Sequence, residues 1–151
     1  MYRRTGSKGR FSNIENAERF IKSLDPVCHE PKFLEIWMAD LGEKNGSIQC
    51  GRRPVLIVSN DKNNRYSTTV NVMPMTTKMN KRNLPCHVEI FDYEKFGLNA
   101  PSTIMIEQMT VIDKQDLLFR VGKIDDNTVL MEICDAMSIQ FPVLANNAKI
   151  I

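Results

Sequence analysis

Long hydrophobic runs are missing from this 151-residue sequence, and no apolar stretch approaches the roughly 18 residues of a membrane-spanning helix. Residues 1–10 are basic but have no apolar segment behind them, so we predict neither a signal peptide nor a membrane protein. Only two histidines are present, and the sequence contains no G-x-S-x-G, H-E-x-x-H, P-loop or G-x-G-x-x-G pattern. These absences exclude the familiar serine hydrolases, zinc proteases and nucleotide-binding folds.

A strong excess of one charge is also missing. Lys and Arg number 20 against 18 Asp and Glu, so the formal net charge is only +2. This balance excludes a histone-like polycation, but it leaves room for a local basic surface that binds phosphate. Hydrophobic residues make up 42% and charged residues 25%, which is typical of a globular domain. The length predicts one main domain with a single core.

The four cysteines are few and widely spaced, with no C-x-x-C pair: Cys28, Cys50, Cys86 and Cys134. We expect them to be reduced, in a cytoplasmic protein. Two of them precede a histidine directly, which raises the question of a zinc site. Adjacent residues on a strand point to opposite faces and rarely bind one ion together. We therefore predict no metal and no cofactor.

Residues 1–32 form a basic N-terminal extension, ahead of a domain over residues 33–151. Ser12 and Glu15 make a capping box, apolar residues follow at helical spacing, and Pro26 ends the pattern, which predicts an amphipathic helix over 13–24. The first ten residues are either a plain tail or a basic arm that contacts nucleic acid. The apolar stripe of the helix packs either on its own domain or across a partner.

From residue 33 the hydrophobic period changes to two, the period of strands. The pattern predicts strands over 34–39, 54–58, 70–75, 87–90, 102–107 and 118–124, a turn over 60–64 and a helical turn over 114–117. The run over 54–58 is apolar throughout, which is typical of a strand buried on both faces. Asp125 and Asp126 cap a C-terminal helix that Pro142 closes. We expect a mainly β fold with helices, built as a small β-barrel.

Groups that suit phosphate binding follow two of these strands. Arg53 stands at the start of a buried strand, and its fork of donors matches phosphate oxygens. Thr76, Thr77 and Lys78 follow another strand end, and each can donate a hydrogen bond. Gln108 closes the strand over 102–107, and we count it with Lys78 among the candidate substrate-binding residues. Each of these groups could also be an ordinary polar strand end.

A series of ordered motifs then gives these residues a context. The first contains Gly46, Ser47, Gln49, Gly51 and Arg53, followed by Pro54 and a β-branched run to residue 58. The others lie at residues 60–61, 64–65, 69–70, 74–76, 84–90, 97–98, 106–108, 112–114, 117 and 122–126. In this combination the sequence, from about residue 34 to 141, resembles the MazF/PemK toxins.

The resemblance implies a fold, an activity and a set of site residues. MazF/PemK toxins are mRNA interferases of toxin–antitoxin systems, with an SH3-like barrel, a homodimeric assembly and metal-independent cleavage of single-stranded RNA. It implies that Arg53 and Thr76 are the catalytic pair and that Ser47, Gln49 and Thr77 lie near the RNA. It also implies an acidic, MazE-like antitoxin as the partner.

The sequence departs from the family pattern at Ile48, where the family usually has Glu, and at Arg52, where relatives often have a small or apolar residue. Either change could alter sequence preference or weaken activity. Two other functions stay open on the same fold. One is a gyrase-poison-like inhibitor, although such proteins end in Trp-Gly-Ile and this sequence ends in Lys-Ile-Ile. The other is a non-catalytic RNA-binding module. Aromatic side chains that could stack on RNA bases are Trp37, Tyr66 and Phe96.

Overall fold

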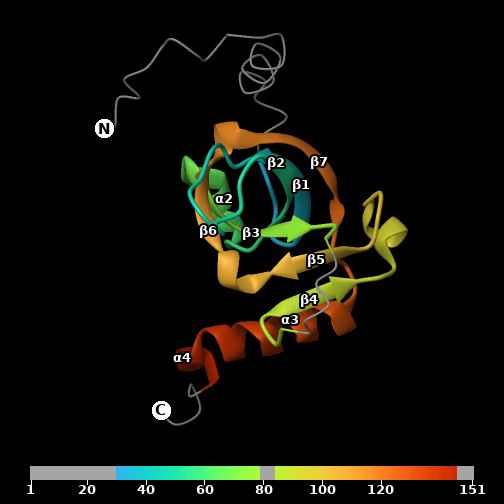
Figure 1. Cartoon of the computed structure of the whole chain (residues 1–151). Coiled ribbons are helices and arrows are strands. Elements are labelled where there is room, and N and C mark those ends of the chain that lie inside the picture. The colour runs from blue at the N-terminus through green and yellow to red at the C-terminus, as the bar shows by residue number, and fades with distance from the viewer. Residues whose placement is uncertain (1–29, 79–83, 146–151) are drawn as a thin grey trace.

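The computed structural model describes residues 30–78 and 84–145 (Figure 1). Within these ranges, seven strands form one antiparallel sheet in the order β4-β5-β3-β2-β1-β7, and β6 pairs with β3. The strands are β1 (Glu35–Asp40), β2 (Arg52–Ile57), β3 (Thr69–Thr76), β4 (His87–Ile90), β5 (Ser102–Met105), β6 (Thr110–Asp113) and β7 (Leu117–Lys123). The helical elements are α2 (Asp61–Tyr66), η1 (Tyr93–Phe96), η2 (Ile106–Gln108), η3 (Lys114–Asp116), α3 (Asn127–Gln140) and α4 (Pro142–Ala145).

The expected mainly β fold with helices is confirmed, in an arrangement where the sheet curls round and α3 lies along β4 (Figure 1). A closed barrel is not confirmed, because no pairing joins the end strands β4 and β7 in the part of the chain that is described. The predicted helix over 13–24 lies outside the described residues. No described helix is long and apolar enough to cross a membrane.

The curl of the sheet explains why its central strands are buried on both faces. Val55, Leu56 and Ile57 of β2 have no exposed surface, as their continuous apolar run predicts. In β1, Ile36 packs into one core and its neighbour Trp37 into another. The first core adds Leu56, Met73, Met75, Ile104, Ile133 and Ala136, and the second adds Ala39, Val55, Ile57, Val70, Val72 and Leu117. Successive side chains of β1 therefore alternate between two hydrophobic cores, and not between a core and solvent.

Two local predictions were wrong. The segment over 60–64 is the start of helix α2 and not a simple turn. Asn60 caps this helix, because its side chain accepts a hydrogen bond from the Asn63 backbone N–H at 2.8 Å. The side-chain amide of the buried Asn64 donates a hydrogen bond to the Ser59 carbonyl at 2.9 Å. The strand predicted over 102–107 ends at Met105, where the chain turns into η2.

The C-terminal helix forms as its cap predicts. The Asp126 carboxylate accepts hydrogen bonds from the backbone N–H groups of Thr128 and Val129, and Ile133 and Ala136 face the first core. The helix ends at Gln140. Pro142 then starts the short helix α4, which the sequence pattern did not predict. Strand β6 was also missed, because its four residues show no clear alternation.

Candidate active site

The two residues of the predicted catalytic pair lie at the same end of neighbouring strands. β2 and β3 pair antiparallel with Val55 opposite Pro74. Continuing this register by two residues puts Arg53, near the start of β2, opposite Thr76, the last residue of β3. Residues opposite each other point to the same face of a sheet. The fold therefore brings Arg53 and Thr76 onto one face at one edge of the second core.

The Arg53 guanidinium is held by the loop that precedes its own strand. Its Nε donates to the Cys50 carbonyl at 2.9 Å, and a terminal nitrogen donates to the Gln49 side-chain oxygen. These contacts use two of the five N–H donors that a guanidinium has in all. Arg53 is half-buried, so its remaining donors can reach a ligand from solvent.

Gln108, from a distant part of the sequence, holds the same loop. Its Oε1 accepts from the Gln49 backbone N–H at 3.2 Å, and its Nε2 donates to the Ser47 carbonyl at 3.3 Å. Ser47 and Gln108 are 61 residues apart in the sequence. Both polar ends of the Gln108 side chain are thus occupied by backbone groups of the loop. This arrangement assigns Gln108 to positioning the loop, where the sequence suggested direct substrate contact.

The end of β3 supplies hydroxyl groups and a positive charge. The Thr76 hydroxyl oxygen accepts a hydrogen bond from the Lys78 backbone N–H at 3.2 Å, which leaves its O–H available to donate. Thr77 and Lys78 follow directly and are exposed. Thr76 also pairs with Thr103 of β5, which fixes the strand end against the next strand. These groups can donate hydrogen bonds to an anion at this edge.

Two of the three aromatic residues suggested for base stacking belong to the cores. Trp37 is 5% exposed and its Nε1 donates to Glu35 at 2.7 Å, and Phe96 is 2% exposed. Tyr66 is 75% exposed, but it ends α2 beside the start of β3, at the opposite end of that strand from Thr76. Eight residues of strand separate the two by roughly 20 Å. None of the three is therefore placed to stack at this site.

A polar cluster that sequence reasoning missed lies next to Gln108. Nε2 of His87 is 2.7 Å from Oε1 of Glu107, and the Cys86 sulfur lies within 4.8 Å of these ligand atoms. The argument that Cys86 and His87 face opposite ways was wrong. Cys86 stands in the turn before β4, where strand alternation does not yet apply. Burial, and then the Glu107 carboxylate, raise the pKa of the Cys86 thiol.

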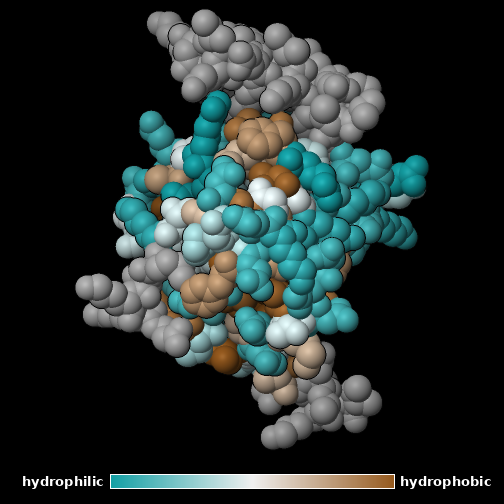
Figure 2. Space-filling model, turned by 90° about the vertical axis from the view of Figure 1, so that its right-hand side faces the viewer, coloured by the Kyte–Doolittle hydropathy of each residue, from teal (hydrophilic) through white to brown (hydrophobic). Residues whose placement is uncertain are grey.

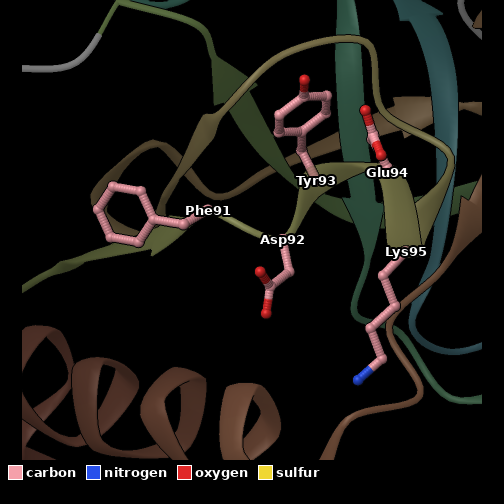
Figure 3. A pocket seen from close by; sticks show the side chains of 5 residues that line it. All are labelled: Phe91, Asp92, Tyr93, Glu94 and Lys95. Atoms are coloured by element: carbon pink, nitrogen blue, oxygen red, sulfur yellow. The ribbon is translucent and has the colours of Figure 1, made fainter.

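A surface pocket away from these residues is formed by five consecutive residues, Phe91 to Lys95. Figure 3 shows their side chains diverging, with Tyr93 and Glu94 on one side of the backbone and Asp92 and Lys95 on the other. Lys95 donates to Asp126 at the start of α3 at 2.8 Å. Because the polar groups do not converge on a common point, this pocket is a weaker candidate than the strand-end site.

Comparison with known families places this geometry in context. Residues 32–141 match the family described as the PemK-like, MazF-like toxin of type II toxin–antitoxin systems. That match covers most of the sequence and includes every residue of the strand-end site. The chain therefore belongs to the PemK-like, MazF-like toxin family.

Individual relatives agree with this assignment. The chain is 37% identical over 110 residues to endoribonuclease EndoA of Bacillus subtilis (strain 168). This match covers 73% of this chain and 93% of that protein. Its fold is similar to the toxin MazF-mt6 of Mycobacterium tuberculosis, with a TM-score of 0.60, 26% identity, and coverage of 72% of this chain and 96% of that one. It is also similar to a mycobacterial endoribonuclease in complex with its cognate antitoxin, with a TM-score of 0.57, 21% identity, and coverage of 75% and 94%.

Proposed function

We propose that this chain is the toxin component of a type II toxin–antitoxin system and acts as a metal-independent endoribonuclease on single-stranded mRNA. The observation that carries the proposal is the antiparallel pairing of β2 with β3, because continuing its register sets Arg53 opposite Thr76, and both side chains keep N–H or O–H donors for a ligand. The 37% identity to an endoribonuclease over most of the chain supports the same reaction.

The chemistry begins with the RNA itself. The ribose 2′-OH attacks the adjacent phosphorus, the bond to the 5′-oxygen breaks, and the products are a 2′,3′-cyclic phosphate and a 5′-OH. The phosphate passes through a pentavalent state that carries more negative charge than the starting phosphodiester. An enzyme accelerates this step by holding the attacking and leaving oxygens in line and by donating hydrogen bonds to the phosphate oxygens.

The strand-end residues fit those two tasks. The free donors of Arg53 can bind two phosphate oxygens at once, because the guanidinium is a planar fork. The Thr76 hydroxyl can donate a further bond and orient the scissile phosphate. An arginine guanidinium does not exchange its protons readily and is a poor general base and acid. We therefore assign Arg53 to stabilising the negative charge on the phosphate and on the leaving 5′-oxygen, while the 2′-OH loses its proton to water and the 5′-oxygen takes a proton from water. Ser47, Gln49, Thr77 and Lys78 contact the flanking nucleotides.

The test is cleavage of a single-stranded RNA of mixed sequence in the presence of EDTA, with analysis of the end groups. We expect cyclic phosphate and 5′-OH ends, and Arg53→Ala should lower kcat by about 10²–10³, the usual effect of removing one transition-state donor. Arg52→Ala is the matched control, because Arg52 is the neighbouring, exposed residue on the other face of β2. It should cleave at close to the original rate.

The same assay separates the alternative functions. A non-catalytic RNA-binding module would bind the RNA and leave it intact, and a gyrase-poison-like inhibitor would do neither. Intact RNA after incubation with a folded protein would therefore exclude the enzymatic function. Loss of activity in Arg52→Ala equal to that in Arg53→Ala would show that general positive charge, and not the Arg53 geometry, drives the reaction.

We extend the proposal to the assembly of the protein. We infer an SH3-like barrel, a homodimer, a cytoplasmic location, and an acidic, MazE-like antitoxin that folds on binding. The antitoxin complex of a mycobacterial relative supports such a partner. Residues 1–32 are proposed as a basic extension whose helix over 13–24 packs on the toxin domain over 33–151, since isolated helices of that length are marginal in water.

A further inference from the structure

We propose that Cys86, His87 and Glu107 form a binding site for one zinc-class transition-metal ion, next to the residue that holds the cleavage loop, Gln108. Their ligand atoms, a thiol sulfur, an imidazole nitrogen and a carboxylate oxygen, all lie within 4.8 Å of one another. Cys86 stands in the turn before β4, His87 is the first residue of β4, and Glu107 belongs to the short helix η2. A site built from residues 20 positions apart depends on how firmly these segments are joined.

The backbone joins them on both sides of the cluster. The Ile106 N–H donates to the Cys86 carbonyl at 3.0 Å, so the residue before Glu107 is bonded to the residue before His87. His87 then pairs with Met105 in the β4–β5 ladder. Metal binding needs only side-chain adjustments on this fixed backbone. A site whose ligands are already held together loses little conformational entropy when the ion binds.

The burial of the ligands supports a built site. The His87 side chain is 8% exposed and that of Glu107 is 26% exposed. Oε1 of Glu107 meets His87, whereas Oε2 is buried and has no hydrogen-bond partner among the residues that the structure describes. An unpaired buried carboxylate oxygen is unfavourable. A cation bound between the carboxylate and the sulfur would satisfy it.

The ligand set identifies the kind of ion. A thiolate and an imidazole favour zinc and related transition metals, whereas magnesium and calcium prefer sites made of oxygen atoms. Zn²⁺ takes four ligands in tetrahedral geometry, so three protein ligands leave one position for water. The thiolate and the carboxylate together balance the charge of the ion. On binding, the Cys86 thiol releases its proton to water, and the hydrogen bond between His87 and Glu107 gives way to two metal–ligand bonds.

A cysteine nucleophile assisted by His87 fits the cluster less well. Reactive cysteines lie in electropositive surroundings that lower the pKa of the thiol. Here burial and the Glu107 carboxylate raise the pKa of Cys86. The negative charge that opposes thiolate formation in the free protein attracts a cation.

The position of the site suggests what an ion would do. Glu107 and Gln108 are neighbours in η2, and Gln108 holds the loop that carries Ser47 and Gln49. An ion bound by Glu107 would tie η2 to the start of β4. It would thereby stiffen the support of the cleavage loop without contacting the RNA.

The test uses a protein in which Cys86 is the only cysteine, made by the substitutions Cys28→Ser, Cys50→Ser and Cys134→Ser. Zn²⁺ is titrated in competition with a chromogenic chelator, and Co²⁺ binding is followed by absorption. We expect one ion per chain and a thiolate-to-cobalt charge-transfer band. Removing any one ligand should lower the affinity for the metal ion, in Cys86→Ser, His87→Gln or Glu107→Gln. The loss should be at least as large as the roughly 10–100-fold that follows when a residue supporting a metal ligand is removed. Glu94→Gln, in η1 and outside the cluster, is the matched control and should leave the affinity unchanged.

A second measurement needs no ligand variant and so does not depend on each variant folding. Zn²⁺ should slow alkylation of Cys86 in the single-cysteine protein by at least about 10-fold, because a thiolate bound to a metal ion is no longer a free nucleophile. Mg²⁺ should have no effect on the rate of alkylation. Absence of zinc binding by this folded protein, or binding that survives Cys86→Ser, would overturn the proposal. The outcome is independent of the cleavage assay, because neither measurement uses RNA.

Discussion

Arg53 shows how one side chain can serve both its own loop and a ligand. Two of its N–H groups donate hydrogen bonds to the Cys50 carbonyl and to the Gln49 side chain. The guanidinium is therefore oriented before any RNA binds. Such preorganisation avoids the entropy loss of ordering a long side chain in the transition state. Gln49 is in turn fixed by Gln108, whose side chain spans from η2 to the loop. The orientation of Arg53 therefore depends on a residue that does not touch it.

Removing the Gln108 side chain tests this dependence. Gln108→Ala should free the loop and lower kcat/KM by about 10-fold, because two backbone contacts of the loop are lost and misplacing groups by about 1 Å can cost up to 10²-fold in rate. Thermal unfolding should change little, because the residue is only half-buried. Gln140→Ala, at the exposed end of α3, is the control and should keep full activity. An unchanged kcat/KM in Gln108→Ala would show that the loop holds itself.

Helix α3 shows at the scale of an element how a cap links a helix to another element, the short helix η1. The Asp126 carboxylate accepts from Lys95 as well as from the backbone N–H groups of Thr128 and Val129. The Lys95 bond, and then the two backbone bonds, lower the pKa of Asp126 below its ordinary value of 3.8. The same ion pair raises the pKa of Lys95 above 10.5. Both groups are therefore charged at neutral pH.

This pair predicts the pH dependence of stability. A carboxyl group with a lowered pKa in the folded state stabilises the fold above its unfolded pKa, and this contribution is lost as the pH falls through the folded value. Asp126→Asn should thus lower the free energy of unfolding at pH 7, and the difference from the original protein should shrink at pH 3. Urea unfolding at both pH values measures it. Asp125→Asn, one residue earlier and outside the cap, should show a smaller change, and an equal change would contradict the assignment.

At the scale of the whole molecule, the surface is mixed. The face shown in Figure 2 is mainly hydrophilic, with smaller hydrophobic areas between. Large apolar side chains are exposed on the two C-terminal helices, namely Met131 and Ile139 of α3 and Val143 and Leu144 of α4. Grouped apolar side chains at a surface often mark contacts with another protein. They agree with the proposal that this chain works in an assembly.

The assembly itself can be measured. The protein should behave as a homodimer of about 35 kDa in light scattering at micromolar concentration, twice the 17.3 kDa of one chain. A protein that lacks residues 1–12 should give the dimer too, because the family match starts only at residue 32. Monomers of the full-length protein across this concentration range would contradict the proposed assembly. Monomers of the shortened protein alone would place the first twelve residues in the interface.

The sequence by itself determined the elements whose signals are local. The apolar run of β2 and the alternation in β1 and β3 predicted strands, because these patterns repeat with the period of the extended chain. The cap at Asp126 predicted α3 for a similarly local reason. The ordered motifs predicted the family, which the match over residues 32–141 confirms. Arg53 and Thr76 were predicted as a pair only through the resemblance to that family.

Only the tertiary structure decided how distant residues meet. Ser47 meets Gln108 across 61 residues, and His87 meets Glu107 across 20, because strand register and the end of β5 at Met105 bring those segments together. The curl of the sheet buries Trp37, which alternation alone would place on one face of a flat strand. Hydrophobic period reports which face of a segment is buried. It contains no information on which other segment covers that face, and this is settled by packing and pairing across the whole chain.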